Sequence, residues 1–243
     1  MNDRTSPRRH LLIAGAVWAV LSIVGILVVL GLQILPVIAS REAVIMEHAL
    51  IVLTVVSVPV LMFVVVGLAY PAIRFRARPG DQDGPPIHGH HRLEVGWVLG
   101  TFAMVVGLFV YGSIGLLDIR GDQHAVLEVE AHAKQWEWDF EYFGTKEFHS
   151  TELVLPVGQR VRILIEGKDV VHSFSVPAFG VKQDAVPGRI TQIYVTPTIV
   201  GKYGVQCAEL CGLGHTKMLA SVTVMEPSDF ADWLAGMQAG TGG

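Results

Sequence analysis

Cys207-Ala-Glu-Leu-Cys211-Gly-Leu-Gly-His215-Thr-Lys-Met218 is the stretch that decides how this chain folds, and both cysteines of the protein lie in it. Thiolate, imidazole and thioether groups are the soft or borderline donors that select copper. Two His, one Cys and a distant axial Met form the usual blue-copper set. Cys211, His215 and Met218 supply three of these donors. The fourth must come from elsewhere, and His172, on a predicted strand, is the best-placed candidate.

Cys207 is one thiolate more than a single copper ion needs. Two thiolates four residues apart on one loop can bridge two metal ions, so that each ion has two sulfurs and one imidazole. Because the charge is then shared, one electron can arrive or leave with little rearrangement. The stretch therefore predicts a dinuclear site that serves electron transfer.

Two other interpretations of the cysteines remain open at this point. Paired Cys in an exported domain ordinarily suggest a disulfide. His215 and Met218 follow Cys211 at four and seven residues, which favours a metal site over a disulfide. Zinc is a weaker alternative, because structural zinc sites seldom recruit Met. Without these partners, His172 would be read as a hydrogen-bonded core residue.

The pattern Cys207-x-Glu209-x-Cys211-x-x-x-His215-x-x-Met218 resembles subunit II of cytochrome c oxidase. His172 and the run Lys-Gln-Asp-Ala-Val-Pro-Gly-Arg at 182–189 precede it and belong to the same resemblance. Nitrous oxide reductase has a similar loop but typically carries Trp where this chain has Glu209. That position favours the oxidase.

The resemblance implies the dinuclear copper A centre, which contains two copper ions. Cys207 and Cys211 would bridge the ions, and each ion would have one histidine cap. The two caps would be His172 and His215, with Met218 as a weak axial ligand. Glu209 would ligate through its backbone carbonyl, and its carboxylate would be directed at a magnesium ion near the interface with subunit I.

The composition indicates a membrane protein. The chain has 243 residues, of which 51% are hydrophobic and only 16% charged, and its mean hydropathy is +0.47. Such a chain is too apolar for an ordinary soluble domain. From Asp118 onward there are 16 acidic and 10 basic residues. An acidic outer half favours a basic partner, and we expect no nucleic acid among the partners.

Three apolar runs, at about 11–39, 46–73 and 95–117, predict transmembrane helices, and residues 1–118 are expected to form the membrane anchor. A cleaved signal peptide ending at Ala39 is the alternative for the first run, although that run is longer than a signal peptide needs. Positive loops stay cytoplasmic. The residues expected on the cytoplasmic side are Arg4, Arg8, Arg9, Arg74, Arg76, Arg78 and Arg92. Residues 119–243 are then expected outside a bacterial inner membrane, in the periplasm.

Glu94, in the pattern Glu94-Val-Gly-Trp97 at the start of the third run, has two interpretations. In the family that the chain resembles, a glutamate at this place is implicated as the entrance of a proton path. A glutamate at a helix N-terminus is also stabilised by the helix dipole alone.

The outer part of the chain has the pattern of an all-β domain. Residues 125–132 alternate between polar and apolar side chains, and short β runs follow at 152–155, 160–165, 172–176, 190–196, 202–206 and 219–224. Short strands broken by Gly and Pro predict a sandwich or barrel. With the copper loop between the last two strands, we expect a cupredoxin-like Greek-key barrel that carries a short C-terminal helix at 227–238. The whole chain is thus predicted to be a multi-domain membrane protein.

Residues 135–142 alternate more sharply, with aromatic side chains on one face and acidic ones on the other. Core packing is one of two interpretations of Trp136. In the family that the chain resembles, the first Trp of Gln-Trp-x-Trp is the surface residue through which an electron enters from cytochrome c, and the resemblance gives this role to Trp136. Glu137, Asp139 and Glu141 would then steer a Lys-rich donor.

These features together predict the electron-accepting subunit of a terminal respiratory oxidase. A c-type cytochrome would be its donor, and subunit I, together with other oxidase subunits, would reduce oxygen to water and translocate protons. Two alternatives remain: the copper subunit of a nitric oxide reductase, and a membrane-anchored copper carrier. A quinol oxidase subunit is disfavoured, because such subunits have lost the copper ligands.

Overall fold

The protein is described by a computed structural model that covers residues 7–32, 37–77, 80, 84, 86, 88–121, 123–144 and 146–240. Arg4 and Arg78, which entered the topology prediction, lie outside the described residues. The chain divides into two compact units. The first comprises Met1–Ile34 and His48–Ile114, and the second comprises Leu35–Glu47 and Gly115–Gly243.

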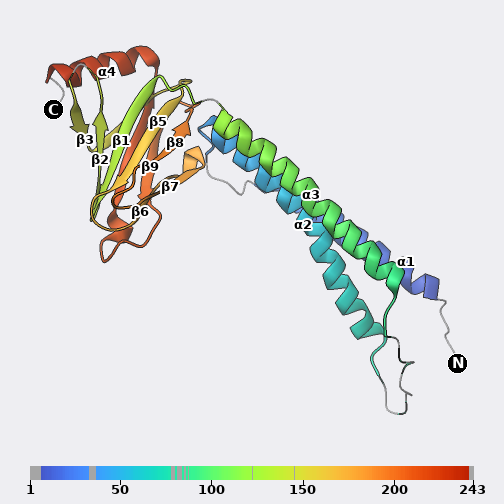
Figure 1. Cartoon of the computed structure of the whole chain (residues 1–243). Coiled ribbons are helices and arrows are strands. Elements are labelled where there is room, and N and C mark those ends of the chain that lie inside the picture. Colours follow the sequence, from blue (N-terminus) through green and yellow to red (C-terminus); the bar gives the residue numbers. More distant parts are fainter. Residues whose placement is uncertain are drawn as a thin grey trace. The chain divides into compact units, whose positions relative to one another are not determined.

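The first unit is helical (Figure 1). Three helices are long and apolar enough to cross a membrane: α1 (Pro7–Gly31), α2 (Arg41–Arg74) and α3 (His91–Gly121). Their apolar side chains are largely exposed, as expected for surfaces that face lipid or other apolar partners. The indole nitrogen of Trp18 on α1 donates to the carbonyl of Pro59 on α2 at 2.8 Å, which joins these two helices. The chain is thus anchored to a membrane by its N-terminal part.

The second unit is a β-sandwich of two five-stranded sheets. The first sheet has the order β3-β2-β1-β5-β8, and the second has the order β4-β10-β9-β6-β7. The first-sheet strands are β1 (Leu127–Lys134), β2 (Glu137–Tyr142), β3 (Phe148–Ser150), β5 (Val161–Gly167) and β8 (Thr191–Val195). The second-sheet strands are β4 (Glu152–Pro156), β6 (His172–Val176), β7 (Val181–Ala185), β9 (Gly201–Cys207) and β10 (Leu219–Met225).

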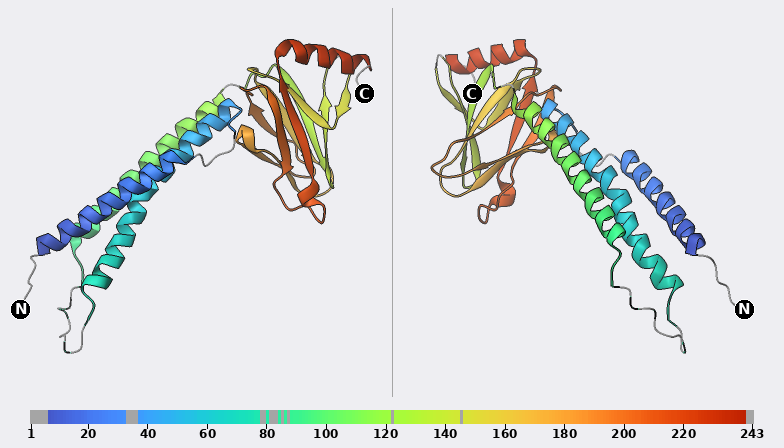
Figure 2. Two further views of the ribbon diagram at one scale, coloured as in Figure 1. Left: turned by 180° about the vertical axis from the view of Figure 1, so that it is seen from behind. Right: turned by 45° about the vertical axis from the view of Figure 1, so that its right-hand side comes forward.

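Crossovers between the sheets give the predicted cupredoxin-like Greek-key fold. The pairs β1–β5 and β4–β10 are parallel, although the other strand pairs are antiparallel. A short 3-10 helix, η1 (Pro177–Phe179), links β6 to β7, and a second, η2 (His215–Lys217), precedes β10. Figures 1 and 2 place the C-terminal helix α4 (Pro227–Ala239) at one end of the sandwich and the loop between β9 and β10 at the other.

The core lies between the sheets and follows the alternation of the strands. On β2, Trp138, Phe140 and Tyr142 are buried, as the alternation predicts. Trp136 does not follow them: it lies in the turn before β2 and is 41% exposed. The interpretation of Trp136 as a core residue is therefore wrong, because the strand begins only at Glu137.

The short segment before and at the start of α2 belongs to the sandwich. Ala39 donates its backbone N–H to Ala178 O at 2.7 Å and accepts from Thr198 N at 2.9 Å. Ser40 forms a β-bridge with Pro197. The apolar run at 11–39 is accordingly longer than α1, which ends at Gly31.

Glu42, on the first turn of α2, forms a buried ion pair with Arg160. Its Oε1 lies 2.8 Å from Arg160 Nη1, and its Oε2 accepts from the backbone N–H of Thr196 at 2.9 Å. Arg160 Nη2 donates to Ile119 O at 2.7 Å. The start of α2 and the end of α3 are thus both held by one arginine of the sandwich.

A second carboxylate joins three strands at the surface. Glu152 on β4 accepts hydrogen bonds from Ser221 and Thr223 on β10 and pairs with Lys202 on β9 at 2.8 Å. The hydrogen bond from Lys202 lowers the pKa of Glu152, and those from the two hydroxyl groups lower it further, against the opposing effect of burial.

Candidate metal centre

The predicted ligands come from three places in the second sheet and its loops. His172 begins β6, and Cys207 ends β9. Cys211 lies in the following loop, His215 on η2, and Met218 directly before β10. The backbone N–H of Cys207 donates to Met218 O at 3.1 Å, which closes the base of the loop. The antiparallel pair β9–β10 therefore brings the two ends of the motif together.

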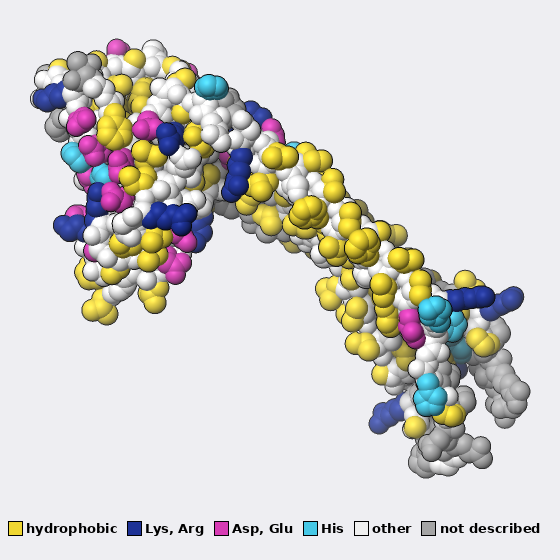
Figure 3. Space-filling model, viewed as in Figure 1, with side chains coloured by type: hydrophobic (Ala, Val, Ile, Leu, Met, Phe, Trp, Pro, Cys, Tyr) yellow, Lys and Arg dark blue, Asp and Glu magenta, His cyan; other side chains and the backbone are white. Residues whose placement is uncertain are grey.

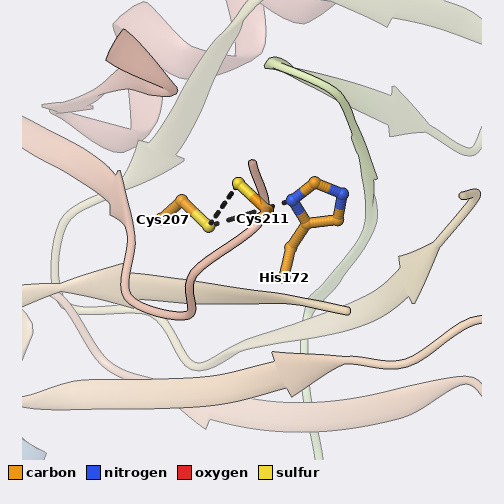
Figure 4. Close-up of side chains that lie close together, drawn as sticks. All are labelled: His172, Cys207 and Cys211. Atoms are coloured by element: carbon orange, nitrogen blue, oxygen red, sulfur yellow. Dashed lines mark hydrogen bonds between the residues drawn. The ribbon is translucent and has the colours of Figure 1, made fainter. Parts of the chain in front are cut away.

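The side chains converge as the motif predicts, and Figure 4 shows three of them. The sulfurs of Cys207 and Cys211 are 3.8 Å apart. His172 Nδ1 lies 3.9 Å from the sulfur of Cys207, and His215 Nδ1 lies 3.5 Å from that of Cys211. The sulfur of Met218 is 3.8 Å from Cys211. His172 and Met218 are fully buried, and both cysteines are nearly so.

The two cysteines do not form a disulfide. Their separation of 3.8 Å is far longer than a sulfur–sulfur bond of about 2.05 Å. Because metal–sulfur bonds are about 2.3 Å and metal–nitrogen bonds about 2.0 Å, two donors on one tetrahedral ion lie ~3.3 to 3.8 Å apart. The observed separations are close to this range. The cluster of His172, Cys207 and Cys211 is therefore compatible with copper binding.

Metal binding would change the protonation state of the cluster. Burial, with the neighbouring thiol of Cys207, raises the pKa of Cys211 to about 11. The protein by itself thus holds this sulfur as a neutral thiol at neutral pH, whereas a bound metal deprotonates a coordinating thiol. A buried pair of thiols beside two imidazoles has the chemistry of a soft-metal site.

An aspartate orients the buried histidine. His172 Nε2 lies 2.7 Å from Asp169 Oδ1, so that Nδ1 is directed at the sulfur of Cys207. Asp169 also accepts backbone N–H groups from Gln135 and Val170. A carboxylate behind a ligating imidazole fixes its tautomer and orientation. The role of Asp169 was not predicted from the sequence, although an acidic residue three positions before a candidate ligand is a usable signal.

Trp136 lies directly against the loop. Its indole N–H donates to Cys211 O at 3.3 Å, and the side-chain amide of Gln135 donates to the same carbonyl at 2.7 Å. The ring packs on Gly214, where a Cβ atom would lie only 2.3 Å from a ring carbon. Gly214 thus allows the loop and the indole to approach each other. The role of Gln135 was not predicted, although it precedes Trp136 in the motif.

Glu209 and Glu94 are the remaining predicted site residues. The backbone carbonyl of Glu209 lies 3.2 Å from the sulfur of Cys207, whereas its side chain is exposed. No hydrogen bond or ion pair joins the Glu209 carboxylate to another residue that the structure describes. Glu94, on the first turn of α3, accepts the backbone N–H of His90 at 2.8 Å. The structure therefore gives Glu94 a contact typical of a helix N-terminus.

The fold and the cluster together define a membrane-anchored, cupredoxin-like protein with a site compatible with copper. Comparisons with known proteins agree. Residues 149–225 match the family described as cytochrome c oxidase subunit II, periplasmic domain. The chain is 31% identical over 205 residues to the alternative cytochrome c oxidase subunit 2 of Bradyrhizobium diazoefficiens, covering 70% of this chain and 72% of that protein. This chain belongs to the family of cytochrome c oxidase subunit II.

Two further similarities define how far the match extends. Cytochrome c oxidase subunit 2 of Alkalihalophilus pseudofirmus is 30% identical over 200 residues, which are 79% of this chain and only 57% of that protein. The crystal structure of the periplasmic domain of subunit II from Bradyrhizobium japonicum is 34% identical, with a TM-score of 0.46. It covers 49% of this chain and 98% of the solved chain.

Proposed function

We propose that this chain is the electron-accepting subunit of a terminal respiratory oxidase. It would work between a c-type cytochrome and a haem-copper catalytic subunit, which would reduce oxygen to water and translocate protons. Membership of the subunit II family supports this proposal. The observation that carries it is the hydrogen bond from the exposed indole of Trp136 to the carbonyl of Cys211, within the buried cluster.

We propose that the cluster holds two copper ions, for which Cys207 and Cys211 are the bridging ligands. The nitrogen ligands would be His172 and His215, and Met218 would be a weak axial ligand. The facing carbonyl of Glu209 would complete the set. When bound, such a pair of ions supplies an acceptor for one electron at a time. The exposed carboxylate of Glu209 would then be free to bind magnesium beside subunit I.

The residues of the chain have separate tasks in this scheme. Asp169 holds the imidazole of His172 toward the sulfurs, and the closed base of the loop holds Cys207 beside Met218. Burial excludes water from the cluster, which limits solvent rearrangement when charge arrives. Trp136 links the exposed surface to the ligand Cys211.

The proposed location is the bacterial inner membrane. Helices α1, α2 and α3 would cross it, and the sandwich would lie on the periplasmic side, with the basic residues of 8–9, 74–76 and 92 inside. Glu94 would then face the cytoplasm, where a proton path from that side would begin.

Replacement of Trp136 tests the proposal. Trp136→Ala should slow reduction of the copper-loaded full chain by a c-type cytochrome, while the copper absorption spectrum stays unchanged. Trp136→Phe separates the ring from the N–H group that contacts Cys211. Phe143→Ala is the matched control, because Phe143 is an exposed aromatic residue that follows the other end of β2. Equal reduction rates in all variants would show that electrons do not enter the copper centre through Trp136.

A further inference from the structure

A second cluster of metal-binding side chains lies on the outer face of the first sheet. It consists of Glu130 and His132 on β1, Glu141 on β2 and Glu166 on β5, and we name it the outer-face cluster. The core-facing residues of β1 alternate with these side chains, so the cluster faces away from the core. Register brings the members together: Glu130 pairs with Glu141, and His132 pairs with Glu166. Acidic side chains and histidines gather on this part of the sandwich in Figure 3.

The imidazole of His132 lies between three carboxylates. Its Nε2 is 3.0 Å from Glu141 Oε2, which is a hydrogen-bond distance. Its Nδ1 is 3.6 Å from Glu130 Oε1 and 3.7 Å from Glu166 Oε2, which is too far for a hydrogen bond. The Nδ1 atom is nevertheless buried and has no hydrogen-bond partner among the described residues.

Neither protonation state of the ring gives Nδ1 a hydrogen bond among the described residues. Because Glu141 only accepts when ionised, Nε2 carries the proton that it receives. A neutral ring then directs the lone pair of Nδ1 at two carboxylates. A charged ring would direct its N–H group at both carboxylates at ion-pair distance, but beyond hydrogen-bond distance of either. A buried polar atom without a partner is costly, and a cation placed between Nδ1, Glu130 and Glu166 would satisfy all three groups.

The charge of the cluster leads to the same conclusion. Three carboxylates surround one imidazole, and the only ammonium group in contact with them among the described residues is that of Lys168, which pairs with Glu166. With a neutral ring, two negative charges remain unbalanced. The neighbouring residue His149 pairs with Asp139 at 2.5 Å. It therefore does not balance the negative charge of the outer-face cluster.

We propose that the outer-face cluster is a binding site for a divalent cation of the Zn²⁺ class, separate from the centre at Cys207 and Cys211. Glu130, His132 Nδ1 and Glu166 would be the ligands; these atoms all lie within 4.8 Å of one another. Two ligands of a tetrahedral Zn²⁺ ion lie ~3.3 Å apart, so the two separations between His132 and the carboxylates, 3.6 and 3.7 Å, would need to contract by a few tenths of an ångström. Lys168, whose side chain is partly exposed, would release Glu166 when the ion binds.

The donor set selects among cations. An imidazole nitrogen disfavours Ca²⁺ and Mg²⁺, which prefer oxygen ligands, and the absence of sulfur from the cluster disfavours Cu⁺. Glu141 would hold the Nε2–H of the ligating histidine, which is the arrangement of a carboxylate–histidine–zinc triad. The fourth position around the ion would open into a hollow of about 640 Å³, which is also lined by Lys134, Glu137 and His149.

Equilibrium dialysis tests the proposal. The full chain in detergent, already loaded with copper, is dialysed against buffered Zn²⁺, and the bound zinc and copper are counted by mass spectrometry. The wild-type chain should bind one equivalent of zinc more than His132→Gln. Glu166→Gln should raise the apparent dissociation constant at least about tenfold, and Glu141→Gln should raise it by about tenfold.

Glu128→Gln is the matched control, since Glu128 lies on the same face of β1 but pairs with Arg162 outside the cluster. It removes one negative charge, as Glu166→Gln does, and should leave zinc binding within about twofold of wild type. If wild type and His132→Gln bind equal zinc, or Glu128→Gln loses it as well, the site does not exist as proposed. Should His132→Gln fail to fold, Glu166→Gln compared with Glu128→Gln decides the question.

Discussion

Removal of the buried charge of Glu42 should destabilise the sandwich far more than removal of the nearby surface ion pair. The side chains of Glu42 and Arg160 are only 3% and 10% exposed. Glu42→Gln leaves the guanidinium of Arg160 buried without its counter-ion, which costs about 3 to 5 kcal/mol when one partner of such a pair is removed. Glu42→Gln retains an oxygen for Thr196 N, so the loss reports on the charge.

The chain supplies a matched control one residue away. Arg41 pairs with Asp118 at 2.9 Å, but these side chains are 56% and 52% exposed. Exposed pairs of this kind contribute about 0 to 1 kcal/mol. Arg41→Ala should therefore change the free energy of unfolding very little. The double variant Glu42→Leu with Arg160→Met should cost less than the sum of the single changes, because no buried charge remains.

Denaturant unfolding of the full chain in detergent, followed by tryptophan fluorescence, measures these differences. Trp138 is buried in the core and reports on the sandwich. Glu42→Gln and Arg41→Ala should differ by at least about 2 kcal/mol, from the ranges given for buried and exposed pairs. Equal effects of the two substitutions, or additive effects in the double variant, would refute the reasoning.

Three further outcomes are expected. Cys207→Ser should bind one copper or none in place of two, and retention of a multi-line mixed-valence EPR signal would contradict the bridging role. Gly214→Ala should displace the ring of Trp136 and slow reduction by a c-type cytochrome with the copper spectrum retained, whereas Gly204→Ala, where no atom lies within 4 Å, should have no effect. Because the pKa of Glu152 is lowered in the folded state, its contribution to stability is present above its ordinary value of 4.5 and is lost as pH falls through the lowered value. Unfolding curves of Glu152→Gln should show a weaker loss of stability in that acidic range.

The cluster was predictable because most of its donors lie on one short loop. Cys207 and Met218 are close in sequence, and the strands on either side of the loop pair with each other. Only His172 had to be found at a distance. The strand alternation also identified the buried side of β2 at Phe140.

Other features depend on contacts that local sequence does not encode. The strand β7 was not predicted, since Lys182, Gln183 and Asp184 give it no apolar alternation, and its pairing with β6 decides its structure. The three-residue strand β3 is too short for a periodic signal. Trp136 continues the alternation of β2 in sequence but lies in the preceding turn.

The pairing of Ala39 and Ser40 with the sandwich has a practical consequence for protein engineering. A soluble fragment that starts at residue 119 keeps all ten strands but omits this early segment and the carboxylate that follows it. Such a fragment would leave the backbone N–H of Thr198 without its partner Ala39 O and the positive charge of Arg160 without its counter-ion Glu42. Fusing residues 37–47 ahead of residue 119 through a short linker, or substituting Arg160 with Met, should give a better-behaved soluble domain.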